Sequence, residues 1–229
     1  MKTSRTLLQT TIFSCSATAL LTLYLPAARA QYTPALQFSG QSANGTASAS
    51  TRGYSFDVTD PNGILVTALS FYDVGADGLS QSHDVGLWNA SGTLLASATV
   101  PAGTAAPLDS SGLFRFVPIT PITLPRGANY AVGAVFTFES FDAQAILWTA
   151  QTTAPGVQYD QARFINNGVP TLTFPTDTIA WTGLPGGSFN MSTIPEPSAA
   201  ALLGVAWFAL LVSRRRRVQA SKLLHHYPT

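Results

Sequence analysis

Short runs in which apolar and polar residues alternate fill the middle of the chain. Between Arg52 and Val58 every second residue is apolar, and this period of two predicts a strand with one buried face. The segment Asp60-Pro61-Asn62-Gly63 then predicts a turn, because proline fixes φ and Asn-Gly accepts positive φ. The next strand is expected to bury the alternating residues Leu65, Thr67, Leu69 and Phe71.

A hairpin is predicted further along, where His83–Trp88 and Thr93–Val100 flank a four-residue loop. More strands are predicted after it, at Leu113–Val117, Tyr130–Phe138 and Ala145–Thr149, with shorter patterns at Arg163–Ile165, Leu172–Phe174 and Ile179–Trp181. The runs are short, and no amphipathic helix separates them. The pattern therefore predicts an all-β fold, an antiparallel β-sandwich of jelly-roll or Ig-like type.

The predicted sandwich covers residues 31–181. Three prolines, Pro118, Pro121 and Pro125, crowd one segment that is expected to lie at a sheet edge, where missing N–H donors do no harm. Residues 182–194 are rich in Gly, Pro and Ser, and this composition predicts a linker.

The first thirty residues have the pattern of a secretory signal peptide. A basic start precedes an apolar stretch, and Ala28-Arg29-Ala30 gives the small-x-small cleavage pattern with Ala28 and Ala30 as its small residues. Cleavage after Ala30 removes Cys15, the chain's one cysteine, so the mature protein has no disulfide. The alternative is a retained anchor, although several Ser and Thr residues interrupt the apolar run.

The other end of the chain combines three elements in order: Pro195-Glu196-Pro197, an apolar run over residues 198–213, and Arg214-Arg215-Arg216-Arg217. As a helix the apolar run is about 24 Å long, somewhat short of the roughly 30 Å hydrocarbon core. The four arginines are expected to stay cytoplasmic, together with the tail 218–229. The acidic body is then expected outside the inner membrane.

Residues 195–217 resemble the PEP-CTERM sorting signal of Gram-negative bacteria, with Pro195, Glu196 and Pro197 as the motif. The resemblance implies transient anchoring in the inner membrane by the C-terminal helix and cleavage by a membrane-embedded exosortase. It also implies delivery to the cell surface or the extracellular space, and an association with exopolysaccharide and biofilm. The tail 218–229 is longer than is usual after the basic cluster. A plain single-span anchor without sorting is the alternative.

A second resemblance lies in the body. The segment from His83 to Thr99 carries V-x-L-W, a turn, and then G-T-L-L-A-S-A-T. It resembles a family of bacterial extracellular β-sandwich domains with no assigned activity, over roughly Ala35 to Phe138. This resemblance implies the sandwich fold and supplies no catalytic residue.

Charge narrows the range of partners. Residues 31–194 hold ten acids, four arginines and no lysine. A nucleic-acid-binding protein needs a cationic face to neutralise phosphates, and this segment lacks one.

Catalytic patterns are sparse, and no catalytic residue is assigned. The body has one histidine, His83, which is interpreted as a surface or hairpin residue, and it has no Gly-x-Ser-x-Gly elbow. Glu139 and Asp142 could form a glycosidase pair if the fold brought them together, but their interpretation is as solvated loop acids. A polysaccharide hydrolase or lyase is the least favoured alternative.

Two binding functions are considered besides a purely structural role. Calcium could be held by Asp57, Asp60 and Asn62, or by Asp73 and Asp77, although the EF-hand pattern is absent and no metal or cofactor is assigned. Sugar rings could stack on Trp88, Trp148 or Trp181, if these are not core residues. The sequence thus predicts a non-enzymatic exported surface or matrix protein, with a carbohydrate- or calcium-binding module as the alternative.

Overall fold

The computed structural model describes residues 32–44, 48–138, 141–179, 183 and 185–194, together with Trp207. In residues 32–194 the described regular structure is β-strand apart from a 3-10 turn at Val74–Ala76, and the strands pair antiparallel. This confirms the predicted all-β fold with antiparallel sheets. The choice between jelly-roll and Ig-like types stays a prediction.

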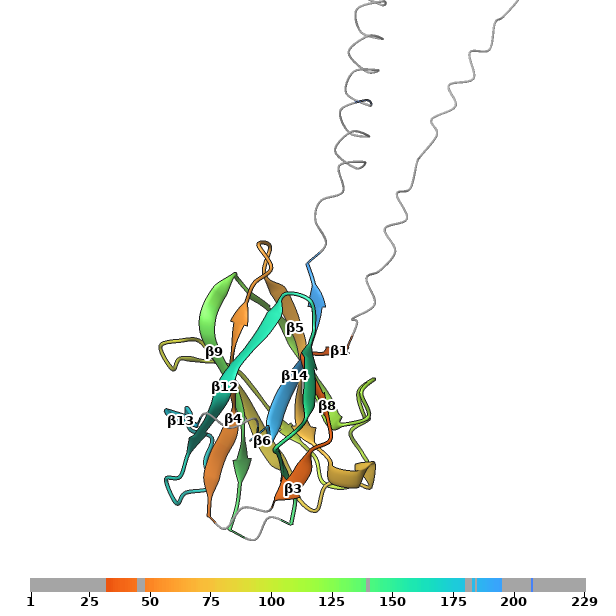
Figure 1. The fold of residues 1–229 in the computed structure, drawn as a ribbon, viewed down its shortest axis with the longest axis vertical. Coiled ribbons are helices and arrows are strands. Elements are labelled where there is room, and N and C mark those ends of the chain that lie inside the picture. Colours follow the sequence, from red (N-terminus) through yellow and green to blue (C-terminus); the bar gives the residue numbers. More distant parts are fainter. Residues whose placement is uncertain are drawn as a thin grey trace, which may run out of the picture.

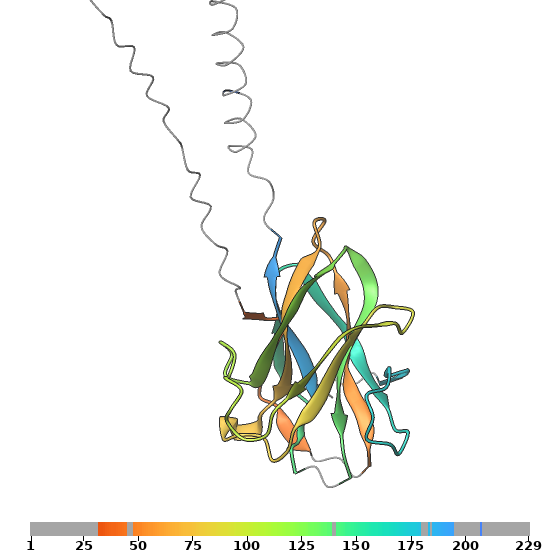
Figure 2. The same cartoon turned by 180° about the vertical axis from the view of Figure 1, so that it is seen from behind.

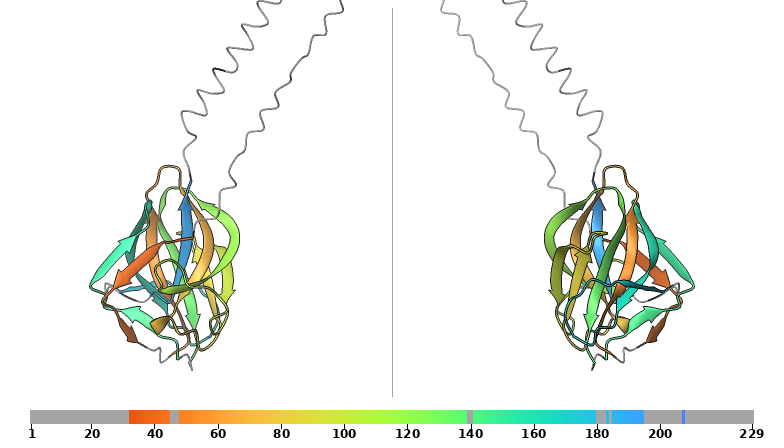
Figure 3. Two further views of the ribbon diagram at one scale, coloured as in Figure 1. Left: turned by 90° about the vertical axis from the view of Figure 1, so that its right-hand side faces the viewer. Right: turned by 90° about the vertical axis from the view of Figure 1, so that its left-hand side faces the viewer.

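The larger sheet has six strands in the order β13-β12-β4-β9-β6-β7. Their bounds are Asp177–Ile179 for β13, Val157–Ile165 for β12, Ser50–Val58 for β4, Gly127–Phe136 for β9, His83–Trp88 for β6 and Leu94–Val100 for β7. The smaller sheet has the order β1-β14-β5-β8. Its strands span Thr33–Pro34, Gly187–Thr193, Ile64–Tyr72 and Phe114–Leu124 in that order. Figures 1 and 2 show opposite faces of the domain, and Figure 3 shows it from two sides.

Two short ribbons complete the described strands. β3 (Ser42–Asn44) pairs with β10 (Gln144–Ile146), and β2 (Leu36–Ser39) pairs with β11 (Ala150–Thr153). The core between the sheets is aromatic. Its largest fully buried side chains include Tyr54, Phe56, Phe71, Phe114, Phe136 and Phe189. With no disulfide among the described residues, this apolar burial is the main driving force for folding.

The predicted linker over residues 182–194 is wrong for most of its length. Gly187–Thr193 forms β14, which lies between β1 and β5 and buries Phe189 and Met191. Its Gly- and Ser-rich composition suggested a linker, but two apolar residues at alternate positions are enough to place the segment in the core. The sandwich therefore extends to Thr193.

The predicted inward face of β5 is wrong at Leu65, whereas Thr67 is buried as expected. Leu69 and Phe71 are buried as expected, but Ile64 and Val66 enter the core and Leu65 is half-exposed. A β-bulge at Thr67 is the cause, because Asn190 of β14 pairs with Ala68 whereas the next residue, Met191, pairs with Val66. One extra residue reverses which side chains face inward.

Other local predictions fared differently. The turn after β4 is confirmed, with the Gly63 amide donating to the Asp60 carbonyl at 3.0 Å. The β6–β7 hairpin is confirmed as well. Two of the three prolines, Pro118 and Pro121, lie within β8, which is an edge strand as expected. Leu172–Phe174 is not a strand.

The C-terminal ends of β14 and β9 point to opposite ends of the sandwich. Thr193 pairs with Ile64, next to the turn that joins β4 and β5. Phe136 pairs with Ser50, at the other end of β4. Figure 1 shows β14 leaving the domain at the top, beside the β4–β5 turn.

Among the described residues, no helix is long and apolar enough to cross a membrane. The predicted signal peptide and the predicted span 198–213 lie outside the described residues, apart from Trp207.

Candidate functional site

Trp88 and Trp148 are core residues, so the alternative of sugar stacking is wrong for both. Trp88 is 3% exposed and makes an edge contact with Phe174, whose centroid lies 6.1 Å away. Trp148 is 5% exposed and stacks on Phe38 at 4.9 Å. Its Nε1 donates to Oε1 of Gln151 at 2.8 Å. Neither ring presents a free face to a ligand.

Several other predicted residues lie outside the described residues. They are Ala28, Ala30, Glu139, Trp181, Pro195, Glu196, Pro197 and Arg214 to Arg217. Their predicted roles stay predictions.

The Asp73 carboxylate binds an arginine. Its Oδ2 accepts from Nε of Arg115 at 2.6 Å, and both side chains are buried. The same carboxylate accepts from the Gly78 amide, and Arg115 donates to the carbonyls of Ala76 and Ala106. This ion pair holds the loop after β5 to β8, and Arg115 also binds the segment before β8 through Ala106. Asp73 is therefore unsuited to the predicted calcium site.

The carboxylates of the other calcium candidate also accept hydrogen bonds from the backbone. Asp60 Oδ1 accepts from the amide of Asn62 at 2.8 Å, a geometry typical of a tight turn. Asp57 Oδ1 accepts from the amide of Asn129 at 2.9 Å. Across the described part of the chain, no group of three or more His, Cys, Asp or Glu side chains is placed to hold a metal ion.

The most strongly connected polar cluster of the body centres on His83 and Asp142. His83 is a residue of the β6–β7 hairpin, as one interpretation had it, but it is 1% exposed, so its interpretation as a surface residue is wrong. Its ring stacks on Phe71 with centroids 3.7 Å apart and planes 9° apart. Its Nδ1 lies 2.8 Å from the carbonyl of Val135, and its Nε2 lies 2.8 Å from Oδ2 of Asp142. Each ring nitrogen of His83 thus faces an oxygen atom.

Asp142 also receives hydrogen bonds from the segment before β6. The Ser80 amide and hydroxyl donate to it at 2.8 Å and 2.7 Å, and the Gln81 amide donates at 3.2 Å. Burial opposes ionisation of this carboxyl, but the hydrogen bonds from His83 and Ser80 outweigh that effect and lower its pKa below the ordinary value. Asp142 is thus a structural anchor rather than a solvated loop acid.

The geometry of this cluster differs from that of a hydrolytic triad. In a triad the histidine lies between the hydroxyl and the carboxylate and takes the hydroxyl proton. Here the Ser80 hydroxyl donates to Asp142, and the second nitrogen of His83 faces a backbone carbonyl. The described contacts therefore stabilise structure, and in them no histidine nitrogen accepts the proton of Ser80.

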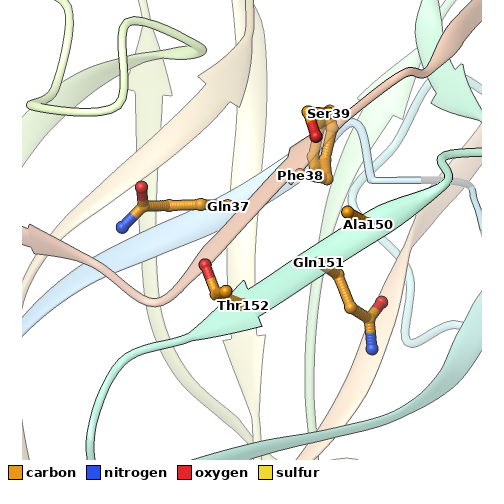
Figure 4. A pocket seen from close by; sticks show the side chains of 6 residues that line it. All are labelled: Gln37, Phe38, Ser39, Ala150, Gln151 and Thr152. Atoms are coloured by element: carbon orange, nitrogen blue, oxygen red, sulfur yellow. The ribbon is translucent and has the colours of Figure 1, made fainter.

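A shallow hollow of about 200 Å³ lies over the β2–β11 ribbon (Figure 4). Gln37 and Thr152 are cross-strand partners on one face, as are Ser39 and Ala150. The hollow is smaller than the roughly 300–1,000 Å³ of typical ligand pockets. It can offer hydrogen bonds but encloses little.

Sequence reasoning missed the two most exposed apolar side chains of the described sandwich, Phe138 and Phe141. Phe138 was predicted as the end of a strand, whereas β9 ends at Phe136. The signal that could have found them was two phenylalanines three residues apart with acids beside them, a poor pattern for a continuing strand.

Comparison with known proteins gives one family. Residues 37–183 match the family described as Domain of unknown function (DUF4082). No curated protein and no solved structure gave a significant match. Because the matched stretch covers more than half of the 229 residues, the chain belongs to the DUF4082 family.

Proposed function

We propose that this protein is an exported, non-enzymatic surface or matrix protein. It is held in the inner membrane by its C-terminal segment, cleaved by an exosortase near Pro195-Glu196-Pro197, and delivered to the cell surface or extracellular space among exopolysaccharides. The observation that carries the proposal is the order of motif, apolar run and arginine cluster directly after the folded body.

The structure of the body suits such processing. β14 ends at Thr193, so Pro195 follows the last hydrogen-bonded strand by two residues. Cleavage at the motif would leave β14 and its buried Phe189 and Met191 inside the sandwich. The released domain would keep its whole core.

The polar contacts of the body support a structural role. The carboxylates of Asp73 and Asp142 are bound by Arg115 and by His83 and Ser80, and the single histidine of the body stacks on Phe71. These side chains stabilise loops, which supports placing the protein outside the hydrolases and lyases.

Intact-mass measurement on membrane and extracellular fractions tests the proposal. In the native host we expect an extracellular form that starts at Gln31 and ends near Pro197, and we expect it to disappear in a host without the exosortase. Glu196→Ala should also abolish release, whereas Asp177→Asn, at an exposed position of β13, should not. An unchanged mass retaining the arginine cluster in both hosts would contradict sorting and indicate a plain anchor.

A carbohydrate-binding role is the second candidate function. Trp88 and Trp148 do not favour it, because both are buried. The observation that favours it is the exposure of Phe138 and Phe141, two aromatic rings presented to solvent.

A further inference from the structure

Two aromatic side chains project from one end of the sandwich. Phe138 is 60% exposed and Phe141 is 89% exposed. Most aromatic side chains of this domain are in its core, and an apolar ring left in water gives up the free energy of burial. Exposed apolar groups that lie close along the chain are candidates for interaction sites. We call these two residues the phenylalanine tip.

The backbone on both sides of the phenylalanine tip is fixed to the segment before β6. On one side, Nε2 of Gln81 donates to Oγ1 of Thr137 at 2.9 Å. On the other side, Asp142 binds Ser80, Gln81 and the buried His83. A binding site held in place before the ligand arrives loses less entropy on binding. The hydrogen bonds around Asp142 therefore position the neighbouring residue Phe141.

The phenylalanine tip lies at the end of the sandwich opposite the exit of β14. Phe138 follows β9, whose last residue pairs with Ser50, while Thr193 pairs with Ile64 at the other end (Figure 1). A domain attached through its C-terminal segment would direct the phenylalanine tip away from the point of attachment. This position favours a partner in the surrounding matrix over the anchoring membrane.

The chemistry around the phenylalanine tip narrows the partner further. Exposed Ser80 and half-buried Gln81 bring hydroxyl and amide groups to the residues that adjoin the two rings. The excess of acids over arginines in residues 31–194 disfavours nucleic acid and anionic lipid. Two rings bury a few hundred Å² at most, well below the roughly 800 Å² per partner of a stable protein interface. With these partners disfavoured, the chemistry favours a ligand that has an apolar face and a rim of hydroxyl groups.

We propose that Phe138 and Phe141 are the contact of this protein with extracellular polysaccharide, each ring packing against the C–H face of a sugar. The inference rests on the proposed function, because it supplies the point at which the displayed domain meets the matrix. Ser80 and Gln81 supply hydrogen bonds at the edge of the contact.

The test is affinity electrophoresis of the protein purified from its native host, in gels that contain exopolysaccharide purified from the same host. Wild-type protein should be retarded, and Phe138→Ala with Phe141→Ala should weaken binding about tenfold or more. Leu94→Ala is the matched control, since Leu94 is an exposed apolar residue at the opposite end of the sandwich. Phe141→Tyr should keep binding and Phe141→Leu should lose it, because stacking needs an aromatic face.

Three results would overturn the proposal. One is equal retardation of the double alanine variant and wild type, with both folded by circular dichroism. Another is full binding by Phe141→Leu, which would indicate general hydrophobicity. The third is no retardation of wild type. If wild type then sediments with vesicles of phosphatidylglycerol and phosphatidylethanolamine, the phenylalanine tip is a lipid contact. Sorting is measured separately by intact mass, so either idea can fail while the other stands.

Discussion

At the scale of single residues, the structure of this domain depends on a few buried charges. Asp73 and Arg115 form an ion pair with a 2.6 Å Nε–Oδ2 distance, and the guanidinium also binds the carbonyls of Ala76 and Ala106. Burial of such a pair costs desolvation energy that its hydrogen bonds must offset. Removing one partner leaves the other charge buried and unpaired.

Arg115→Met is therefore expected to lower the free energy of unfolding by about 3–5 kcal/mol, measured by urea denaturation. Arg126→Met, at an exposed position, should change it by less than about 0.5 kcal/mol. Adding Asp73→Leu to Arg115→Met should recover part of the loss, because it removes the unpaired charge. Equal urea midpoints for Arg115→Met and wild type would show that the pair contributes nothing.

Asp142 makes the stability of the domain depend on pH in the acid range. Its pKa is lowered in the folded state, because hydrogen bonds from His83 and Ser80 outweigh the opposing effect of burial. The stabilisation is fully present above the unfolded-state pKa of about 3.9 and is lost as the pH falls through the lower folded-state pKa. We expect Asp142→Asn to flatten this part of the stability curve, measured by urea denaturation between about pH 2 and 5.

The pH dependence of stability must be compared between wild type and variants, because a second carboxyl changes stability with pH in the opposite direction. Burial raises the pKa of Asp109, so the contribution of this carboxyl to the free energy of unfolding falls as the pH rises. Asp77→Asn, at an exposed position, serves as the control and should leave the acid dependence of wild type intact. An identical pH dependence in Asp142→Asn and wild type would contradict the role given to Asp142.

At the scale of elements, glycines set how closely the two sheets approach. Gly53, Gly133 and Gly86 pair in a row across β4, β9 and β6. Gly187 of β14, in the other sheet, faces this row, and a Cβ built on it would lie 2.7 Å from the carbonyl carbon of Gly133. Real Cβ atoms do not come so close to backbone atoms, so β14 fits here because position 187 has no side chain.

Gly187→Ala is expected to destabilise the domain by about 1–3 kcal/mol in thermal or urea unfolding, because the sheets must move apart. Gly127→Ala is the matched control on β9. Its Cβ would lie 3.4 Å from the Tyr130 ring, an ordinary contact, and should change stability by less than about 0.5 kcal/mol. Similar stabilities for the two variants would mean that the backbone contact is not tight.

The alternating pattern predicted most strands but neither the bulge in β5 nor the pairing of β14. The face of β5 reverses at Thr67, and only the register with β14 reveals the extra residue. β14 itself carries Gly, Ser and Asn among two apolar residues. Its place between β1 and β5 depends on contacts more than a hundred residues apart in the chain, which no local pattern contains.

The polar cluster was even less accessible to sequence reasoning. His83 and Asp142 are 59 residues apart, and nothing in either local sequence links them. The sequence left two interpretations open for Trp88 and Trp148, because an aromatic residue in a strand suits either a core or a binding surface. The fold resolved that choice by covering one ring with Phe174 and stacking the other on Phe38.

At the scale of the whole molecule, one strand connects the folded domain with the predicted sorting signal. β14 pairs along β5 from Phe71 to Ile64 and carries β1 on its other side. The family match ends at residue 183, before this strand begins. The smaller sheet nevertheless needs β14, because without it β1 and β5 have no partner between them.

A pair of truncated chains tests this dependence. Both begin at Gln31, and they end at Gly186 or at Ile194. Loss of β14 removes the buried Phe189 and Met191, each worth about 2–5 kcal/mol, against a total stability of about 5–15 kcal/mol for a typical domain. The shorter chain should therefore show no cooperative transition in urea or on heating, whereas the chain ending at Ile194 should unfold in one step. A cooperative transition of similar midpoint in both would show that the sandwich is complete at Gly186, and the segment after it would again be a linker.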